Sequence, residues 1–394
     1  MNSKDEEKEN LNNLNIINEP KLNSINNSFN SSNIDDSQLK SSPIPNFLFQ
    51  ENIITHCDCT FGLNESFDVF KSIKDNNYYL ILSNCKNNNI EIIDIISKNV
   101  IKSIEGNTSR FILLKYYLNL INKTEYIIIA DIKGIIKIIN ISDNYNVLSQ
   151  INSPKELKNT WNFINCSILF NIQINSKKLD IIIVSSRARY SEEYPTKIYD
   201  MNNGQFLKDI SNTKNNKTRF IIPWYNEKND QYYLIECCEE LLIVVNIFHN
   251  EIYAKLDEEK FKAYSSGFIH KKNKIDYLYT STSCNEVNIW NLFEKQLVKK
   301  IRISNKLNNI RIYGLLLWKE NYLVANNDTN KSIIVIDLTQ NKVTSFFWNK
   351  HNESVRCLKR INHPTFGKCL LTGGDDHSIK LWKSIPIIYR DIFE

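Results

Sequence analysis

The stretch Leu371-Thr372-Gly373-Gly374-Asp375-Asp376-His377-Ser378-Ile379-Lys380-Leu381-Trp382 joins two short apolar segments through a polar turn. Lys383 follows the tryptophan. Counting back from Lys383, an Asp or Asn residue recurs at nearly fixed steps. Counted backwards, the steps are 46, 46, 45, 46, 60 and 46 residues. A period of roughly 40–50 residues is typical of a blade repeat, so seven marks predict a seven-bladed β-propeller. The earlier marks are Asp337, Asn291, Asn246, Asp200, Asn140 and Asp94.

The fifth repeat shows the expected content of one blade. Apolar, turn-bounded segments predict strand a at Lys262–Ile269, strand b at Asp276–Ser283, strand c at Glu286–Asn291 and strand d at Gln296–Ile303. Cys284-Asn285 form the turn between strands b and c. The prediction is an all-β ring of four-stranded antiparallel blades.

The strands of a blade differ in their apolar pattern. Strand b is a nearly continuous apolar run, as in Tyr126–Ala130 and Ile181–Val184. Such runs fit strands buried on both faces between stacked blades. Strand d alternates, as in Gln296–Ile301, which predicts an outer, half-exposed strand. A buried helix is the competing interpretation, but the runs are short, β-branched and bounded by turns.

The 60-residue step indicates an insertion of about 14 residues in the third blade, relative to the usual repeat length. Two segments are candidates. One is Asn171–Leu179, between strands a and b, and the other is Ser186–Thr196, between strands b and c.

The chain divides into three predicted regions. Residues 1–45 are rich in Asn, Ser and acids and carry a net charge of −3, so we expect a disordered tail. Residues 46–384 form the propeller, and residues 385–394 form a short tail. The segment Asn52–Cys57 precedes the first strand a, near Phe67–Ile73, and we expect it to be the outer strand of the last blade. The alternative closing strand, Ile385–Tyr389, contains Pro386, which lacks the N–H that a paired strand uses.

Composition limits the classes of function. The net charge is +5, and without the acidic tail it is +8, which is weaker than the basic stripe of most nucleic-acid binders. The nine cysteines form no spaced framework, the N-terminus is not a signal peptide, and apolar runs such as Leu241–Val245 are too short to span a bilayer. We expect a cytoplasmic protein, with the nucleus as an alternative, that is not secreted and has no transmembrane segment.

The C-terminal repeat resembles the WD40 family. Thr372–Trp382 is similar to the family's strand b, turn and strand c, and His351 stands where the family has a histidine before strand a. The resemblance implies a structural hydrogen-bond chain through His351, Thr372, Asp376 and Trp382. The fifth repeat retains Thr280 and Trp290 but has Cys284 in place of the aspartate, and the first retains Ser83 and Asp94. Elsewhere only the spacing carries the resemblance, which covers about residues 50–383.

Several segments contain chemically reactive residue types, and each has a structural interpretation. His56-Cys57-Asp58-Cys59 has metal-ligand residues but no second pair at a zinc spacing. Cys237-Cys238 lie on a predicted strand b, and Asp375-Asp376-His377 lie in the turn of the best repeat. No glycine-rich phosphate loop or nucleophile elbow occurs. We therefore expect no catalytic residue, no metal and no cofactor.

The strongest binding candidate is the segment Ser185–Pro195, at one of the two possible insertion sites. It contains Arg and Tyr, the residue types enriched in binding hot spots. A solvated loop with an internal Arg–Glu pair is the competing interpretation. Lys271-Lys272-Asn273-Lys274 and Lys299-Lys300 are better explained as a charged loop tip and an outer strand face. The candidate partner-binding residues are Arg187, Arg189, Tyr190, Glu192 and Tyr194.

The family resemblance implies a scaffold without catalysis. We expect it to bind proteins or peptides through its rim loops, as a monomeric propeller within a larger complex. The alternative is a substrate-recruiting subunit of an enzyme complex such as a ubiquitin ligase. Against that, no Trp-Asp-x-Arg motif occurs: Trp290 is followed by Asn291 and Trp382 by Lys383. The Phe-Arg-Arg-Gly motif of phosphoinositide-binding propellers is also absent. Nucleic-acid binding would show a steep loss of affinity with salt.

Overall fold

The computed structural model describes 28 strands and no helix in the ranges that it covers. Those ranges are 46–54, 67–84, 89–105, 111–131, 133–152, 163–174, 177–187, 195–210, 218–238, 241–256, 264–283, 285–303, 312–327, 331–347 and 351–385. Residues 1–45 and 386–394 lie outside the described residues, so the predicted disorder of the tail and the proposed domain boundaries stay predictions.

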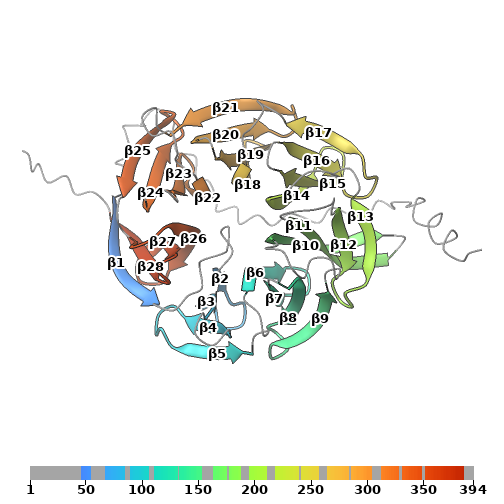
Figure 1. The fold of residues 1–394 in the computed structure, drawn as a ribbon, viewed down its shortest axis with the longest axis horizontal. Helices are drawn as coiled ribbons and strands as arrows, with labels where there is room; N and C mark the ends of the chain where they lie inside the picture. Colours follow the sequence, from blue (N-terminus) through green and yellow to red (C-terminus); the bar gives the residue numbers. More distant parts are fainter. Residues whose placement is uncertain are drawn as a thin grey trace, which may run out of the picture.

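The strands form seven four-stranded antiparallel sheets arranged in a ring (Figure 1). We number the blades 1 to 7 from β2 onward and call the strands of each blade a to d from the centre outward. The a strands are β2 (Phe67–Lys71), β6 (Phe111–Asn119), β10 (Phe163–Ile174), β14 (Phe220–Asn226), β18 (Tyr264–Lys272), β22 (Ile312–Lys319) and β26 (Val355–His363). The b strands are β3 (Tyr78–Ser83), β7 (Thr124–Asp131), β11 (Lys177–Arg187), β15 (Gln231–Cys237), β19 (Ile275–Thr282), β23 (Tyr322–Asn327) and β27 (Gly367–Gly374). The c strands are β4 (Ile90–Asp94), β8 (Ile135–Asn140), β12 (Thr196–Asp200), β16 (Leu242–Asn246), β20 (Glu286–Asn291), β24 (Ser332–Asp337) and β28 (Ile379–Ile385). The d strands are β5 (Val100–Ile104), β9 (Asn146–Asn152), β13 (Phe206–Ile210), β17 (Ile252–Leu256), β21 (Gln296–Arg302), β25 (Lys342–Phe347) and, in blade 7, β1 (Asn46–Ile54).

The ring closes through the N-terminal strand, as the sequence predicts. Strand β1 pairs antiparallel with β28, with Phe49 opposite Trp382 and Ile54 opposite Ile379. In Figure 1 this strand lies on the outer edge of the last blade. The closing strand begins at Asn46, earlier than the predicted segment Asn52–Cys57, and residues 55–57 lie outside the described ranges. Pairing the first strand with the last repeat removes an open sheet edge.

Burial follows the position of each strand in its blade. Strand β7 is buried at every position except its first, and β20 and β24 are buried throughout. Strand β21 alternates between exposed and half-buried residues until Ile301. These patterns confirm the prediction that inner strands are covered on both faces and that d strands form a half-exposed outer edge.

The extra residues of blade 3 are divided among its connections and its inner strands. Strands β10 and β11 have 12 and 11 residues, whereas β18 and β19 of blade 5 have 9 and 8. A bulge interrupts the longer pair between Leu169 and Ile172, where the Asn171 N–H donates to Asp180 Oδ1 at 2.7 Å. The connection from β11 to β12 also spans eight residues, against three in blade 5. Both candidate segments therefore contribute to the 60-residue step.

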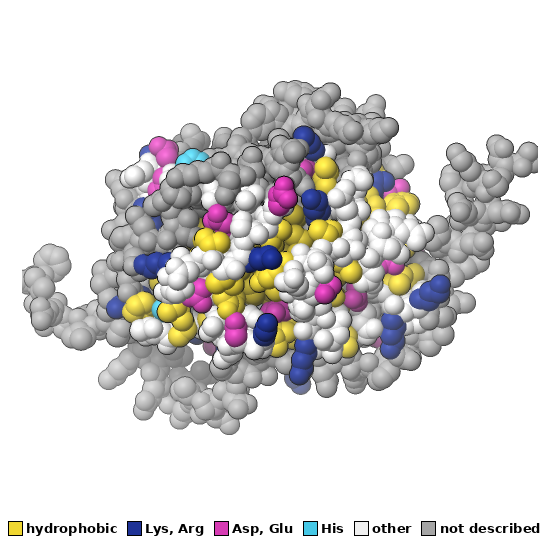
Figure 2. Space-filling view, turned by 90° about the horizontal axis from the view of Figure 1, so that it is seen from below, with side chains coloured by type: hydrophobic (Ala, Val, Ile, Leu, Met, Phe, Trp, Pro, Cys, Tyr) yellow, Lys and Arg dark blue, Asp and Glu magenta, His cyan; other side chains and the backbone are white. Residues whose placement is uncertain are grey.

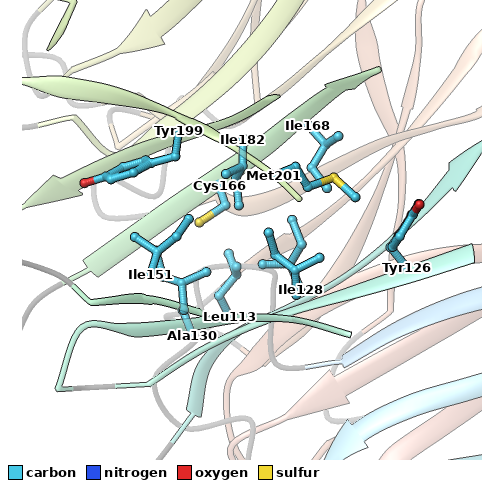
Figure 3. Close-up of a cluster of buried hydrophobic side chains, with 12 residues drawn as sticks. Leu113, Tyr126, Ile128, Ala130, Ile151, Cys166, Ile168, Ile182, Tyr199 and Met201 are labelled. Carbon is cyan, nitrogen blue, oxygen red and sulfur yellow. The ribbon is translucent and has the colours of Figure 1, made fainter. Parts of the chain in front are cut away.

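Seven clusters of buried apolar side chains fill the spaces between neighbouring blades. Figure 3 shows the cluster between blades 2 and 3, where Leu113 and Ile128 face Cys166 and Ile182. The cluster between blades 7 and 1 joins Cys357 and Leu371 to Phe67 and Leu80, among others. Because each blade is covered by two neighbours, a single blade cannot bury its faces alone, and the ring folds as a unit.

The periodic Asp and Asn residues have a common local role. Each of the marks from Asp94 to Asp337 is the last residue of a c strand, and its side-chain oxygen accepts backbone N–H groups of the following turn. Asp337 Oδ1, for example, accepts from Thr339 at 2.7 Å and from Gln340 at 3.1 Å. A short carboxylate or amide side chain reaches these donors, which explains the residue type at the six marks before Lys383.

Asparagine also replaces glycine in the turns, as the composition suggests. Of the fifteen described non-glycine residues with positive φ, seven are asparagine. Asparagine tolerates the left-handed region better than most residues, because its short side chain bonds locally to the backbone.

Candidate interaction surfaces

The ring has two rims of different character. The a–b and c–d connections lie on one rim, which we call the short-turn rim, and span two to six residues. The b–c and d–a connections lie on the other, which we call the long-connection rim, and span three to twelve residues. Loop length and sequence vary most on the long-connection rim, which is where a rigid scaffold usually presents binding residues.

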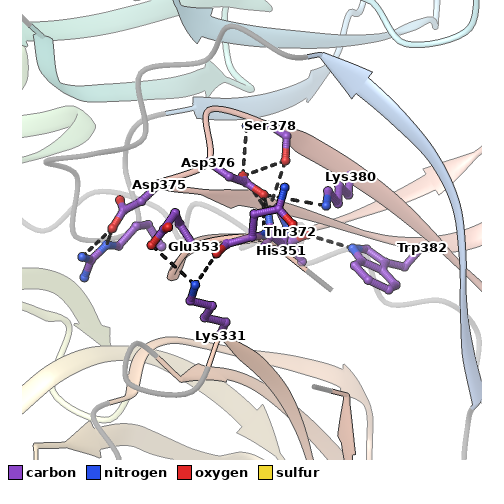
Figure 4. Close-up of polar contacts among 11 residues, drawn as sticks. Lys331, His351, Glu353, Thr372, Asp375, Asp376, Ser378, Lys380 and Trp382 are labelled. Atoms are coloured by element: carbon purple, nitrogen blue, oxygen red, sulfur yellow. Dashed lines mark hydrogen bonds and ion pairs between the residues drawn. The ribbon is translucent and has the colours of Figure 1, made fainter. Parts of the chain in front are cut away.

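The predicted chain of polar side chains in blade 7 lies inside the sheet. His351, Thr372 and Trp382 have relative exposures of 1%, 0% and 0%. His351 Nδ1 lies 2.9 Å from Asp376 Oδ1, His351 Nε2 lies 2.7 Å from Thr372 Oγ1, and the Trp382 indole N–H donates to Thr372 Oγ1 at 2.8 Å (Figure 4). The structure thus brings together all four residues that the resemblance named.

The proton positions in this chain follow from the groups at its two ends. A carboxylate only accepts, so His351 Nδ1 is the donor to Asp376. An indole N–H only donates, so Thr372 Oγ1 accepts from Trp382, and the direction of its bond to His351 Nε2 follows the tautomer of the imidazole. Each of the four side chains has a hydrogen-bond partner within the network, which makes the network a rigid structural element.

Asp376 is held in its charged form. Burial by itself would raise the pKa of this carboxyl group, but hydrogen bonds and charge from His351, with further bonds from Ser378 and the Asn352 N–H, hold the pKa well below its usual range. The Ser378 hydroxyl donates to Asp376 Oδ1 at 2.7 Å, and Lys380 Nζ lies 3.7 Å from Oδ2. Gly374 leaves room for this arrangement, because a Cβ there would lie 2.6 Å from His351 Nδ1.

Other blades keep parts of this network. In blade 5 the Trp290 indole N–H donates to Thr280 Oγ1 at 3.2 Å, and both residues are buried. Ser83 of blade 1 is buried at the end of β3, and Asp94 caps its turn. Blades 4 and 5 are joined by a hydrogen bond from the Trp224 indole N–H to Asp276 Oδ2 at 2.9 Å. The sequence analysis does not predict this bond. Neither residue belongs to the repeated motif, so no spacing signal could reveal it.

The predicted partner-binding loop lies on the long-connection rim of blade 3. Arg187 is the last residue of β11, and the structure does not describe its side chain. Arg189, Tyr190, Glu192 and Tyr194 lie outside the described residues. Their role in binding therefore stays a prediction.

The remaining sequence candidates have the following places. Cys237 and Cys238 are buried, and burial raises the pKa of the Cys237 thiol well above its usual value, which disfavours a nucleophilic thiolate. The segment from His56 to Cys59 lies outside the described residues. The turn from Lys271 to Lys274 is on the short-turn rim, where Lys271 Nζ lies 2.5 Å from Glu227 Oε2. On the outer strand of blade 5, the Lys299 ammonium donates to the Leu338 carbonyl at 2.5 Å.

The innermost strands are strongly basic, a feature that the overall charge conceals. The seven a strands contain eight Lys or Arg residues and a single carboxylate, Asp68. Asp68 Oδ1 lies 2.8 Å from Lys359 Nζ of blade 7, and its Oδ2 accepts the Tyr116 N–H of blade 2 at 2.8 Å. The Arg360 guanidinium donates to the Leu317 carbonyl, a neutral partner, at 2.8 Å. The strands around the centre of the ring thus carry excess positive charge.

Two features are absent from the described part of the chain. No group of three or more His, Cys, Asp and Glu side chains there is placed to hold a metal ion. No helix in the same ranges has the length and apolar character needed to cross a membrane.

Comparison with known proteins identifies the fold and no family. No family model matches the sequence, and no curated protein matches it. A crystal structure of BBS1N in complex with ARL6DN, soaked with mercury, is similar over 86% of this chain and 97% of that chain, with a TM-score of 0.61 and 10% identity. In all, 1388 solved chains match, so the architecture is widespread and does not select a function. The seven-bladed propeller is confirmed, and membership of the WD40 family stays a prediction.

Proposed function

We propose that this chain is a non-enzymatic platform of the WD40 type, which binds protein partners through its long-connection rim. The observation that carries the proposal is the contrast between the two rims on one closed ring. The framework repeats blade after blade, whereas the connections on the long-connection rim range from three to twelve residues. Variable loops on a repeated frame are typical of binding surfaces.

The fold, the blade 7 network and the buried cysteines are each consistent with this proposal. The fold is compatible with an interaction scaffold, and the similar BBS1N propeller was crystallised in complex with ARL6DN. The satisfied network of blade 7 contributes to stability, which accounts for its His and Asp without assigning them to chemistry. The buried free thiols Cys237 and Cys369 support a reducing, cytoplasmic location as part of the same proposal.

The basic a strands suggest the chemistry of one partner. At the mouth of the ring on the short-turn rim, opposite the long-connection rim, the exposed last residues of three a strands are Lys71, Lys272 and Lys319. Positive charge at this mouth favours an acidic partner segment and raises its association rate.

The test is an affinity purification from cells with the full chain. The variant Arg187→Ala/Arg189→Ala/Tyr190→Ala is compared with wild type and with Glu251→Ala/Lys255→Ala, two exposed positions on the outer side of blade 4. We expect the loop variant to recover at least one specific partner about tenfold less, a loss typical of hot-spot residues, while the control recovers it fully.

Thermal melting of the same variants checks that the ring stays folded. An unchanged set of partners would remove the loop from the proposal. A wild-type chain that recovers no protein above background would contradict the platform itself.

A further inference from the structure

Exposed apolar side chains are concentrated on two of the seven blades. Among the described residues, ten large hydrophobic side chains are exposed, and seven of them belong to blades 1 and 2. Figure 2, seen from the side on which β5 and β9 lie in Figure 1, shows apolar side chains at the surface beside lysines. Single exposed apolar residues are ordinary, but a concentrated group marks an interaction site. The seven are Ile73, Ile96, Val100, Ile101, Leu120, Ile121 and Val147.

These residues come from neighbouring turns of the short-turn rim. Ile73 lies in the a–b turn of blade 1, and its N–H donates to Glu125 Oε1 of blade 2 at 3.1 Å. Leu120 and Ile121 lie in the turn that leads to the same strand β7. Ile96 follows the mark Asp94 in the c–d turn of blade 1. We call this group of turn and strand-start residues the apolar rim patch.

Local structure does not require apolar residues at these positions. The Asn119 side chain holds the turn of blade 2 by accepting the Ile121 N–H at 3.0 Å, a bond that is independent of the side chains at 120 and 121. Yet Leu120 and Ile121 are 58% and 54% exposed. The local structure of the turn therefore does not account for two adjacent aliphatic side chains at its tip.

The charges around the patch are mainly positive at the surface. Exposed lysines stand on the same turns, at Lys71, Lys74, Lys98 and Lys123, against exposed Asp75 and Asp143. Glu125 is buried and its carboxylate accepts the Ile73 N–H, half-buried Asp94 accepts the Ile96 N–H, and Asp75 accepts the Tyr79 hydroxyl. The next a–b hairpin adds exposed Lys177 and Lys178, beside the half-buried Asp180.

Shape and composition favour a lipid surface over a protein. The a–b and c–d turns of blades 1 and 2 span four to six residues, so none of them projects far beyond the strands that it joins. Protein interfaces are rich in Trp, Tyr and Arg and poor in Lys, whereas the patch consists of Ile, Leu and Val with lysines around it. Aliphatic groups at the headgroup boundary combined with lysines near anionic lipid are the two components of interfacial membrane binding.

We propose that the short-turn rim of blades 1 and 2 docks onto an anionic lipid surface. Leu120 and Ile121 enter the headgroup boundary, and the neighbouring lysines contact the lipid phosphates. This leaves the long-connection rim facing away from the membrane, so it extends the platform proposed above without depending on it.

The test is co-sedimentation of the full chain with vesicles of phosphatidylcholine alone, or with about 30% phosphatidylserine, a content that gives a negative surface potential. Leu120→Asp/Ile121→Asp is compared with Val298→Asp, which alters an equally exposed apolar residue on blade 5. We expect wild type and the control to bind the anionic vesicles. The double variant should partition about tenfold less, because two aliphatic side chains no longer enter the lipid.

Three results would overturn the proposal. One is a wild-type chain that stays in the supernatant with both vesicle types, and another is a double variant that binds as wild type does. The third is a wild-type chain that does not bind vesicles but forms a dimer in sedimentation velocity, together with a double variant that is monomeric. The patch would then contact a second copy of the chain. The two proposals are separated by the loop variant in Arg187, Arg189 and Tyr190. If this variant loses its protein partners but still binds vesicles, lipid binding does not depend on the loop.

Discussion

Replacing Thr372 by valine removes one hydroxyl from the centre of the blade 7 network and keeps nearly the same side-chain volume. In the native chain that hydroxyl accepts from the Trp382 indole at 2.8 Å and contacts His351 Nε2 at 2.7 Å. All three side chains are almost fully buried, so water cannot replace the lost partner. A buried polar group without a partner costs about 1–3 kcal/mol, so two such groups predict a loss of about 2–6 kcal/mol in the free energy of unfolding.

Blade 5 offers a matched control. Thr280 is also fully buried and accepts from Trp290 at 3.2 Å, but the structure gives it no histidine partner there. The substitution Thr280→Val leaves one indole N–H unpaired and should cost about 1–3 kcal/mol, less than its counterpart in blade 7. Thr372→Ser keeps the hydroxyl and loses only a methyl group, which predicts a loss of about 1 kcal/mol.

The assay is urea unfolding followed by circular dichroism and tryptophan fluorescence, with the slope compared between variants before free energies are calculated. Coincident transitions from the two probes establish that the ring unfolds in one step. A Thr372→Val transition within about 0.5 kcal/mol of wild type, the range of an ordinary surface substitution, would refute the structural role of the network. Equal losses for Thr372→Val and Thr372→Ser would assign the effect to packing instead of hydrogen bonding.

Three further perturbations test the same framework. Gly374→Ala places a Cβ 2.6 Å from His351 Nδ1 and should lower the melting temperature through a loss of about 1–3 kcal/mol in stability. The control is Gly367→Ala, whose Cβ meets no atom within 4 Å and which should cost about 1 kcal/mol from its φ of +70° alone. Because the pKa of Asp376 is depressed in the folded chain, its contribution is present above the unfolded value of 3.8 and is lost as pH falls below it. Asp376→Asn should therefore flatten the fall in stability below about pH 4, measured by melting across an acid series, and an unchanged slope would contradict the shift. Asp68→Asn removes the ion pair between blades 1 and 7 and should lower the free energy of unfolding in urea by about 1 kcal/mol. A wild-type unfolding midpoint that does not change with salt concentration would argue against that contribution.

The sequence predicts the propeller well because each blade repeats the same local chemistry. A c strand must end in a side chain that caps the next turn, so Asp or Asn recurs at each mark and the period stays visible although glycine is rare. The fifth repeat illustrates the result: its predicted strand c, Glu286–Asn291, agrees with β20, and its other strands differ only at their ends. Strand ends are harder to place because the apolar pattern weakens gradually there.

The interaction surfaces depend on residues that the sequence does not connect. Lys359 meets Asp68 only because the ring closes, and no pattern relates a residue near the end of the chain to one near its start. The basic character of the ring's centre appears only when the seven a strands are seen to line it, since the chain as a whole has a net charge of just +5. The insertion of blade 3 was located by its spacing, but its division between hairpin and loop required the strand register.

By itself the sequence determined the repeat, the number of blades and the use of an N-terminal segment to close the ring, whereas the residues of the blade 7 network were expected from the resemblance to the WD40 family. Each of these depends on local spacing or on a short motif, which a single chain displays directly. Only the tertiary structure decided which apolar residues are buried. In the sequence, Leu120 and Ile121 continue the apolar pattern of β6, but the strand ends at Asn119 and both side chains are exposed in the turn that follows. Exposure depends on what packs against a residue from elsewhere in the chain, and that is a property of the assembled ring.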